Sequence, residues 1–312
     1  MPGPKVGIAC MTPRGIAVLR RVMALRPEVE LTVVSAREEG GEPGFFEALR
    51  AVTREYGGQF HEGRNLATLA QAGLLNPSAL DLLLLVNWRW LVPASLYRQP
   101  RQGAFVFHDS LLPAYRGFSP TCWAIINGEA TTGATLFAIA DDVDAGDIIG
   151  QQQVAIGPDD TVMTVMGRVT EAYLRLLEMH LEELLAGTAA PRPQEHGKAT
   201  YACKRTAEDN RIDWAAPTLV IHNLVRAVTH PYPGAFTSLE GRRLRVWSSR
   251  RDLEPRNYRG RIPGAVVGFG QAGEAAVLTG DGVLILDCVQ LEDGPAVRPA
   301  EVFSSLGVRL GR

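Results

Sequence analysis

One histidine in the middle of the chain is placed where chemistry is common. His108 ends the apolar run from Ala104 to His108, and a group of carboxylates follows it further along. The group consists of Asp141, Asp142, Asp144 and Asp147. An imidazole can give or take a proton near neutral pH, and a carboxylate can orient it. From position alone, His108 is more often a strand-end histidine with satisfied hydrogen bonds than a catalytic group, so its surroundings must decide.

Buried strands must position these side chains. Lys5 to Cys10, Leu82 to Val86 and Ala104 to His108 are short apolar runs, and segments with helical periodicity separate them. Strands that alternate with helices favour an α/β fold with a doubly wound, mostly parallel sheet. Functional sites of such sheets lie beyond the carboxyl ends of the strands. His108 is therefore predicted to lie at the functional edge of the sheet.

The chain of 312 residues is longer than a domain with one ordinary hydrophobic core, so we predict two domains. We predict a first domain at residues 1–188 and a linker at 189–204, since Gly, Pro and Ala occur around the linker without apolar periodicity. In residues 205–312, short β runs separated by Gly and Pro turns predict a small OB-like barrel.

Two short patterns resemble motifs but lack the required context. The glycines of Gly268 to Gly273 match GxGxxG, yet a strand pattern follows them instead of a helix, so we predict a hairpin turn. The carboxylates around Asp142 lack the spacing of a calcium loop. The four cysteines are scattered without a CxxC pair, which argues against zinc and against a disulfide framework. We expect no bound metal.

The charge and hydropathy of the chain also exclude classes of partner. A net charge of −2 gives no general attraction to phosphate backbones, so a nucleic-acid partner is disfavoured. The apolar run Leu82 to Val86 is far shorter than the ~20 residues of a membrane span, and the first residues lack a signal-peptide layout. We expect a cytoplasmic protein and consider a homodimer as its assembly.

The stretch that begins at Val106 contains the motifs HDSLLPAYRGFSPTCWAIINGE, TGATL and DDVDAGDII. Together they resemble the family that takes a formyl group from 10-formyltetrahydrofolate, which includes methionyl-tRNA, glycinamide ribonucleotide and sugar N-formyltransferases. Later segments, such as RTAEDNRIDW, are most similar to the formyltransferase domain acting on UDP-4-amino-4-deoxy-L-arabinose. The resemblance covers nearly the whole chain.

The resemblance implies that the chain moves a formyl group to an amine, a reaction that passes through a tetrahedral oxyanion and releases a proton. By motif, His108 is the donor or proton shuttle, and Asp144 positions it. The family's third catalytic residue, an Asn, is replaced here by Val106. Because strand side chains alternate, Val106 is expected on the same face as His108, where it cannot donate a hydrogen bond. Asp109 projects to the other face, where we expect it to cap or orient the SLLP turn.

Loss of one oxyanion donor typically costs ~10²–10³ in rate. Three interpretations therefore stay open: a slower or rearranged formyltransferase, a related reaction on the same scaffold, and a folate or nucleotide binder without activity. An amide from Asn87 could replace the missing donor from another direction.

The resemblance also assigns binding residues. The folate site would comprise the loop Asn87, Trp88, Arg89, Trp90 and Leu91, the turn Ser110, Leu111 and Leu112, and Asp142. The two tryptophans could enclose a flat ring or pack in the core. Residues proposed for the acceptor substrate are Tyr115, Arg116, Gly117, Arg205, Asn223 and Arg226. Arg116 would be an anion contact or a solvated side chain.

The acceptor is expected to be a primary amine of a small metabolite, foremost a nucleotide-linked amino sugar. Relatives that act on tRNA carry a basic insertion after the second strand, whereas this chain has the acidic segment Ala36 to Glu42 at that place. Methionyl-tRNA is therefore the less favoured acceptor.

Overall fold

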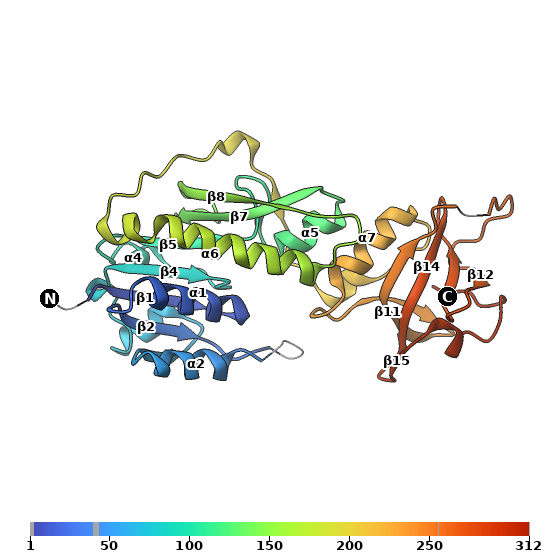
Figure 1. The fold of residues 1–312 in the computed structure, drawn as a ribbon, viewed down its shortest axis with the longest axis horizontal. Helices are drawn as coiled ribbons and strands as arrows, with labels where there is room; N and C mark the ends of the chain where they lie inside the picture. The colour runs from blue at the N-terminus through green and yellow to red at the C-terminus, as the bar shows by residue number, and fades with distance from the viewer. Residues whose placement is uncertain (1–2, 40–43, 255, 312) are drawn as a thin grey trace. The chain divides into compact units, whose positions relative to one another are not determined.

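The computed structural model describes residues 3–39, 44–254 and 256–311, which form two compact units (Figure 1). The first unit contains the chain up to residue 120 together with residues 131–155 and 166–203. The second contains residues 121–130, 156–165 and the chain from residue 204 onward.

The first unit is built on a seven-stranded sheet with the order β3-β2-β1-β4-β5-β7-β8. Its strands are β1 (Lys5–Cys10), β2 (Glu30–Ser35), β3 (Gln59–Glu62), β4 (Leu82–Val86), β5 (Ala104–His108), β7 (Thr131–Ala138) and β8 (Ile148–Ala155). Strands β1 to β5 are parallel, and β7 and β8 are antiparallel to their neighbours. The mixed α/β class with a mostly parallel sheet is thus confirmed.

Helices cover both faces of this sheet, which is doubly wound. They are α1 (Thr12–Leu25), α2 (Phe46–Glu55), α3 (Leu66–Gln71), α4 (Ala94–Tyr97) and the long α6 (Val162–Ala186). Ion pairs from Arg21 and Arg26 to α6 place α1 and α6 on one face, and both lie in front of the strands in Figure 1. Apolar residues of α3 and α4 pack with Leu83 and Leu85 of β4 on the other face. Burial of both faces explains why β4 is apolar at every position.

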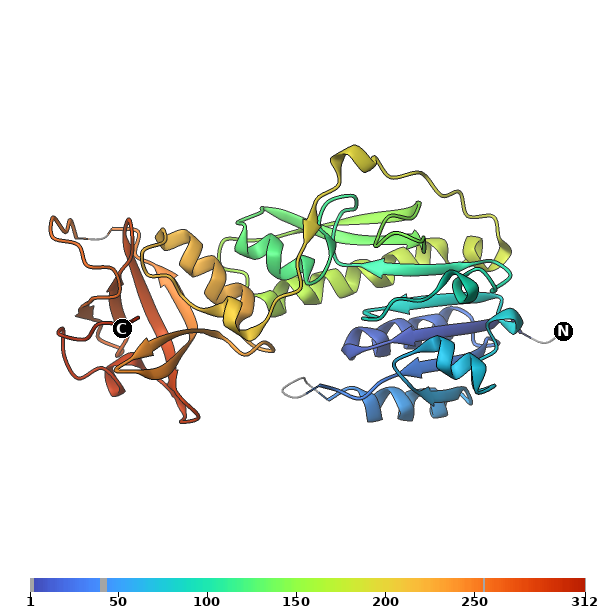
Figure 2. The same cartoon turned by 180° about the vertical axis from the view of Figure 1, so that it is seen from behind.

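Residues 189–204, predicted as a linker, run along the first unit with specific hydrogen bonds. The backbone of Arg192 pairs with that of Ile148, and the short strand β9 (Tyr201–Ala202) pairs with β6 (Arg116–Gly117). The segment also contains a 3-10 turn at His196–Lys198. In Figure 2 this segment is the yellow stretch along the upper edge of the first unit, and it passes beside the loop that carries β6.

The second unit is an antiparallel sheet with the helix α7 (Thr218–Val228) against β11. Its path is β10 (Ala235–Leu239), β11 (Arg242–Arg251), β14 (Val283–Leu291), β13 (Ala275–Leu278) and β12 (Val266–Phe269), and β15 (Ala296–Val297) also pairs with β14. Backbone bonds of residues 308–311 reach Gly264 and Val266 at one end of this path and Ser238 at the other. The glycine pattern at Gly268 to Gly273 is the β12–β13 hairpin turn, as predicted.

Helix α5 (Pro120–Ile126) belongs almost entirely to the second unit by its contacts. None of the helices in the described ranges is long and apolar enough for a membrane crossing.

The cysteine thiols differ in burial. Cys10 is fully buried at the end of β1, and burial raises its pKa to about 12, whereas Cys203 is exposed. Since the thiolate is the reactive form, we expect a disulfide reagent at pH 8 to modify Cys203 of the native protein first and to leave Cys10 intact until unfolding. Peptide mapping after timed labelling checks this, with Cys203→Ser as control. Fast labelling of Cys10 in folded protein would contradict it.

Candidate active site at the carboxyl end of β5

His108 is held from two sides by oxygen atoms. Its side chain is buried at the end of β5, and its Nε2 lies 2.8 Å from the carbonyl oxygen of Tyr115. Because a carbonyl only accepts, Nε2 carries the proton of this hydrogen bond. The other ring nitrogen, Nδ1, lies 3.5 Å from Oδ2 of Asp144. The structure therefore brings together the two residues that the motif pairs.

Asp144 is fixed in turn by a backbone donor. Its Oδ2 accepts a hydrogen bond of 2.7 Å from the amide of Gly117, and its side chain is 17% exposed. The residue has a left-handed backbone with φ of 51°. That conformation is uncommon outside glycine and is tolerated mostly by Asn and Asp. The carboxylate thus bridges the Gly117 amide and the His108 ring.

Left-handed backbone at non-glycine residues gathers around this edge of the sheet. Such residues follow β1 and β4 and occur in both loops that contact His108: Thr12, Asn87, Tyr115 and Asp144. Thr12 is β-branched, for which this region is a genuine outlier. Strained backbone of this kind persists where surrounding contacts fix it, and it is common at functional sites.

Val106 occupies an apolar environment on the His108 side of the sheet. The ring of Phe107 packs on Tyr173 of α6 with centroids 4.8 Å apart, so the residues before and after it in β5 face the opposite side. There Val106 packs against Leu112, Phe137 and Ile148. Its side chain gives the site shape and no hydrogen-bond donor.

The residues assigned to a folate site form one loop and one turn. Trp88 and Trp90 meet edge to face with ring centroids 5.0 Å apart. The Nε1 of Trp88 is buried and has no hydrogen-bond partner among the described residues. Asn87 accepts a hydrogen bond of 3.1 Å from the Thr12 hydroxyl through Oδ1, which directs its NH₂ group elsewhere. Leu91 is 85% exposed, and Arg89 and Asp142 are also exposed.

The Ser110-Leu111-Leu112 turn is anchored by Thr135 of β7, a residue not singled out from the sequence. Its hydroxyl donates to the carbonyl of Ser110 at 2.6 Å and accepts from the amide of Leu112 at 3.1 Å. The Ser110 hydroxyl donates to the Ala114 carbonyl. A threonine inside a strand pattern carries no signal for such a role, because its partners lie in a distant turn.

The residues assigned to the acceptor substrate fall into both units. Arg116 is buried, and its guanidinium donates to Gln194 Oε1 at 2.6 Å and 3.2 Å, so it is not the solvated side chain considered from sequence. In the second unit, Arg226 donates to Asn223 Oδ1 and to the carbonyls of Gly157 and Asp160. Burial lowers the pKa of Arg226.

Arg205 makes a separate set of contacts in the second unit. It donates to the Asp209 carbonyl and to Asn210 Oδ1, and its guanidinium lies over the ring of Trp123. Of the three second-unit residues, Asn223 and Arg226 thus bond each other, whereas Arg205 joins a different set.

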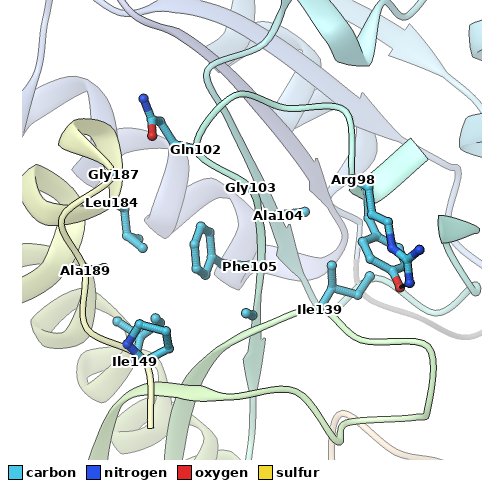
Figure 3. A pocket seen from close by; sticks show the side chains of 13 residues that line it. Arg98, Gln102, Gly103, Ala104, Phe105, Ile139, Ile149, Leu184, Gly187 and Ala189 are labelled. Atoms are coloured by element: carbon cyan, nitrogen blue, oxygen red, sulfur yellow. Dashed lines mark hydrogen bonds between the residues drawn. The ribbon is translucent and has the colours of Figure 1, made fainter. Parts of the chain in front are cut away.

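A hollow of about 400 Å³ lies at the other end of β5 (Figure 3). Phe105 and Leu184 point into it from opposite sides, and Arg98 and Gln102 stand at its margin. It contains neither His108 nor Asp144. In the ranges that the structure describes, no three His, Cys, Asp or Glu side chains gather as a metal site.

The side chain of Asp109 lies on the opposite face of the sheet from His108, as predicted, and bonds there to helices α1 and α6. Its side chain points to the α6 face, where it accepts hydrogen bonds from Arg14 of α1 and from the hydroxyl of Tyr173. Burial alone would raise the pKa of Asp109, but the charge and hydrogen bond of Arg14 and the hydrogen bond of Tyr173 outweigh it and lower the pKa. Burial, followed by the Asp109 charge, raises the pKa of Tyr173 well above its usual value. The strand end that carries His108 is therefore tied to two helices.

We expect Asp109→Asn to lower the free energy of unfolding by about 3–5 kcal/mol at neutral pH, because it leaves the charge of Arg14 buried without its counterion. Since folding lowers the pKa of Asp109, its stabilising contribution exists above the ordinary carboxyl range and disappears as the pH falls through the folded-state value. Urea unfolding of both proteins at several pH values measures the difference. The exposed pair Arg20–Glu55 gives the control Glu55→Gln, with an expected cost below about 1 kcal/mol. A pH-independent difference would contradict the assignment.

Two family models match this chain. The model described as formyl transferase matches residues 33–179, and the model of the formyl transferase C-terminal domain matches residues 204–307. Together they cover more than half of the sequence, including β5, His108 and Asp144.

Solved structures share the fold at low identity. HypX from Aquifex aeolicus in complex with tetrahydrofolic acid is 17% identical with a TM-score of 0.65, and the match covers 98% of this chain and 48% of HypX. The chain thus spans about half of the length of HypX. WlaRD, a sugar 3N-formyl transferase crystallised with dTDP and 5-N-formyl-THF, is 15% identical with a TM-score of 0.68, over 94% of this chain and 99% of WlaRD. An N-formyltransferase from Helicobacter canadensis with folinic acid and dTDP-3-aminofucose is 19% identical with a TM-score of 0.67, over 91% and 98%.

Proposed function

Since the chain belongs to the formyl transferase family of transferases, we propose that it moves a formyl group from 10-formyltetrahydrofolate to the primary amine of a small metabolite, foremost a nucleotide-linked amino sugar. The observation that carries the proposal is the contact between His108 and Asp144 at the carboxyl end of β5. General acid–base groups must lie within reach of one another and of the reacting atoms, and these two are held together by loops from distant parts of the chain.

The proposed roles follow from the atoms that the two residues present. In formyl transfer the amine nitrogen bonds to the formyl carbon, the bond from that carbon to N10 of the folate breaks, and a proton passes from the amine to N10. The bound donor supplies an activated formyl carbon. A proton taken up at Nδ1 of His108 would lie next to the Asp144 carboxylate, which stabilises the charged ring. The Tyr115 carbonyl keeps the ring in orientation through Nε2.

The residues of the Trp88 loop fit a flat heterocyclic ring. An indole N–H buried without a partner costs about 1–3 kcal/mol, so a ligand acceptor that met the Trp88 Nε1 would gain that energy. Trp90 adds a second aromatic face at low entropic cost. Neighbouring structures crystallised with tetrahydrofolic acid, folinic acid or formyl-THF support a folate donor for this chain.

The acceptor is proposed from the neighbours and from charge. Two structural neighbours that match over nearly their full lengths are a sugar 3N-formyl transferase crystallised with dTDP and an N-formyltransferase in complex with dTDP-3-aminofucose. The acidic segment at residues 36–42, which argues against tRNA, lies partly outside the described residues. The polar side chains of Arg116, Arg205, Asn223 and Arg226 bond within the protein, so we keep Tyr115 and Gly117 as the foremost proposed contacts for the acceptor. Cytoplasmic location and a homodimer belong to the same proposal.

Val106 favours a second candidate function. It packs among apolar residues where the family has an Asn, so the site lacks one donor for the oxyanion. A folate or nucleotide binder without turnover, or a related reaction on this scaffold, would tolerate that loss. The NH₂ group of Asn87, oriented by the Thr12 hydroxyl, is our candidate for a replacement donor.

We expect release of tetrahydrofolate when the protein is incubated with 10-formyltetrahydrofolate and a panel of 3-amino and 4-amino sugar nucleotides, with methionyl-tRNA included as the alternative acceptor. His108→Ala should reduce this turnover by about 10²–10⁴, the usual share of acid–base catalysis. His180→Ala, a histidine of α6 paired with Glu183, is the matched control and should leave the rate unchanged. Folate binding without turnover over the whole panel would support the binding protein instead.

Val106→Asn tests whether the missing donor limits the reaction. If the usual mechanism operates with one donor absent, the substitution should raise kcat by about tenfold or more, because an amide can then meet the developing negative charge. Val106→Ala changes the size of the side chain without adding a donor and is the control. An Asn variant that abolishes an existing activity would show that the site works in a different way.

A further inference from the structure

Gln194 is buried in the segment predicted as a linker, and all of its side-chain hydrogen-bonding groups are used. The residue is 5% exposed. Its Oε1 accepts from the Nη2 and Nε of Arg116 at 2.6 and 3.2 Å. Its Nε2 donates to the carbonyl of Asp144 at 2.9 Å and to that of Gly146 at 2.7 Å. One amide therefore connects the β6 strand with the loop that carries Asp144.

The bonds of Gln194 to Arg116 and to the Asp144 loop both affect the position of the Asp144 carboxylate. Arg116 precedes Gly117, whose amide donates to Asp144 Oδ2. The carbonyl of Asp144 itself is bonded to Gln194. The side chain of Gln194 thus fixes both the donor to the carboxylate and the backbone from which the carboxylate projects.

The loop needs such a restraint because its backbone is strained and tightly packed. Asp144 is in the left-handed region at φ of 51°. At Gly146, an added Cβ would lie 1.7 Å from the Ala138 carbonyl oxygen, so the loop passes directly against β7. Backbone in this state keeps its geometry only when neighbouring contacts determine it. The two hydrogen bonds from the buried Gln194 amide to the carbonyls of Asp144 and Gly146 are such contacts.

We infer that Gln194 is a positioning residue, which sets the Asp144 carboxylate beside His108 Nδ1 through the loop backbone. The effect of Gln194 on catalysis rests on the proposed function, whereas its effect on the position of Asp144 does not. It does not touch the imidazole. A glutamine at this place is suited to the task because it accepts from a guanidinium at one end and donates to two carbonyls at the other.

Gln194→Glu breaks one half of this arrangement. A glutamate can still accept from Arg116, but it has no N–H groups for the carbonyls of Asp144 and Gly146. Gln290→Glu is the matched control in the second unit, since Gln290 also accepts at Oε1, from Trp247, and donates at Nε2, to Gly294. Gln194→Met, similar in length and without polar ends, is the second variant if the glutamate variant does not fold.

The first readout needs no substrate. In protein labelled with ¹⁵N-histidine at a fixed pH, the Nδ1 resonance of His108 should move in Gln194→Glu toward its position in Asp144→Asn, and it should stay unchanged in Gln290→Glu. A folded Gln194 variant with the wild-type resonance overturns the inference. This result is independent of whether the protein transfers formyl groups.

The second readout uses turnover. With the assay described for the proposed function, Gln194→Glu should lower kcat by about ten- to a hundredfold, as expected for a misplaced group, with a smaller change in KM. In the Asp144→Asn background the same change should cost little more, because both act through one carboxylate. A full additional loss in the double variant would contradict the inference. Absence of turnover in the wild type would count against the proposed function and leave the resonance test intact.

Discussion

The contact between His108 Nδ1 and Asp144 Oδ2 is the interaction around which the rest of the site is arranged. The two side chains come from β5 and from the loop after β7. A third segment supplies the Tyr115 carbonyl, which bonds His108, and the Gly117 amide, which bonds Asp144. Together they hold the imidazole and the carboxylate next to each other.

On the opposite face of the sheet, a buried ionic cluster holds the same end of β5. Behind His108, the next residue Asp109 is buried with Arg14 and Tyr173. Ionic groups taken out of water add little stability for their own sake, but they cost much if one member is removed. The cluster ties the end of β5, and with it the backbone next to His108, to α1 and α6 through side-chain bonds.

Sequence patterns correctly predicted the strands whose two faces are both buried. They did not predict segments whose structure depends on individual hydrogen bonds. The bounds of β1, β4 and β5 agree with the apolar runs because continuous burial leaves a continuous signal. The strand β3, QFHE, is half exposed and carries no such run. Likewise Gln194 sits in a Pro-rich stretch whose order comes from single hydrogen bonds, and these leave no periodic trace. The domain bounds and the site roles stay predictions.

Val106 shows how stability and chemistry compete at one position. Its side chain completes an apolar cluster with Leu112, Phe137 and Ile148, which favours the ligand-free protein. An asparagine there would bury an amide among these groups and cost about 1–3 kcal/mol until a ligand met its hydrogen bonds. A site built for the oxyanion accepts that cost, since the amide is used only when charge develops. The valine removes the cost together with the donor, so any activity of this chain must obtain its oxyanion stabilisation elsewhere at the same edge of the sheet.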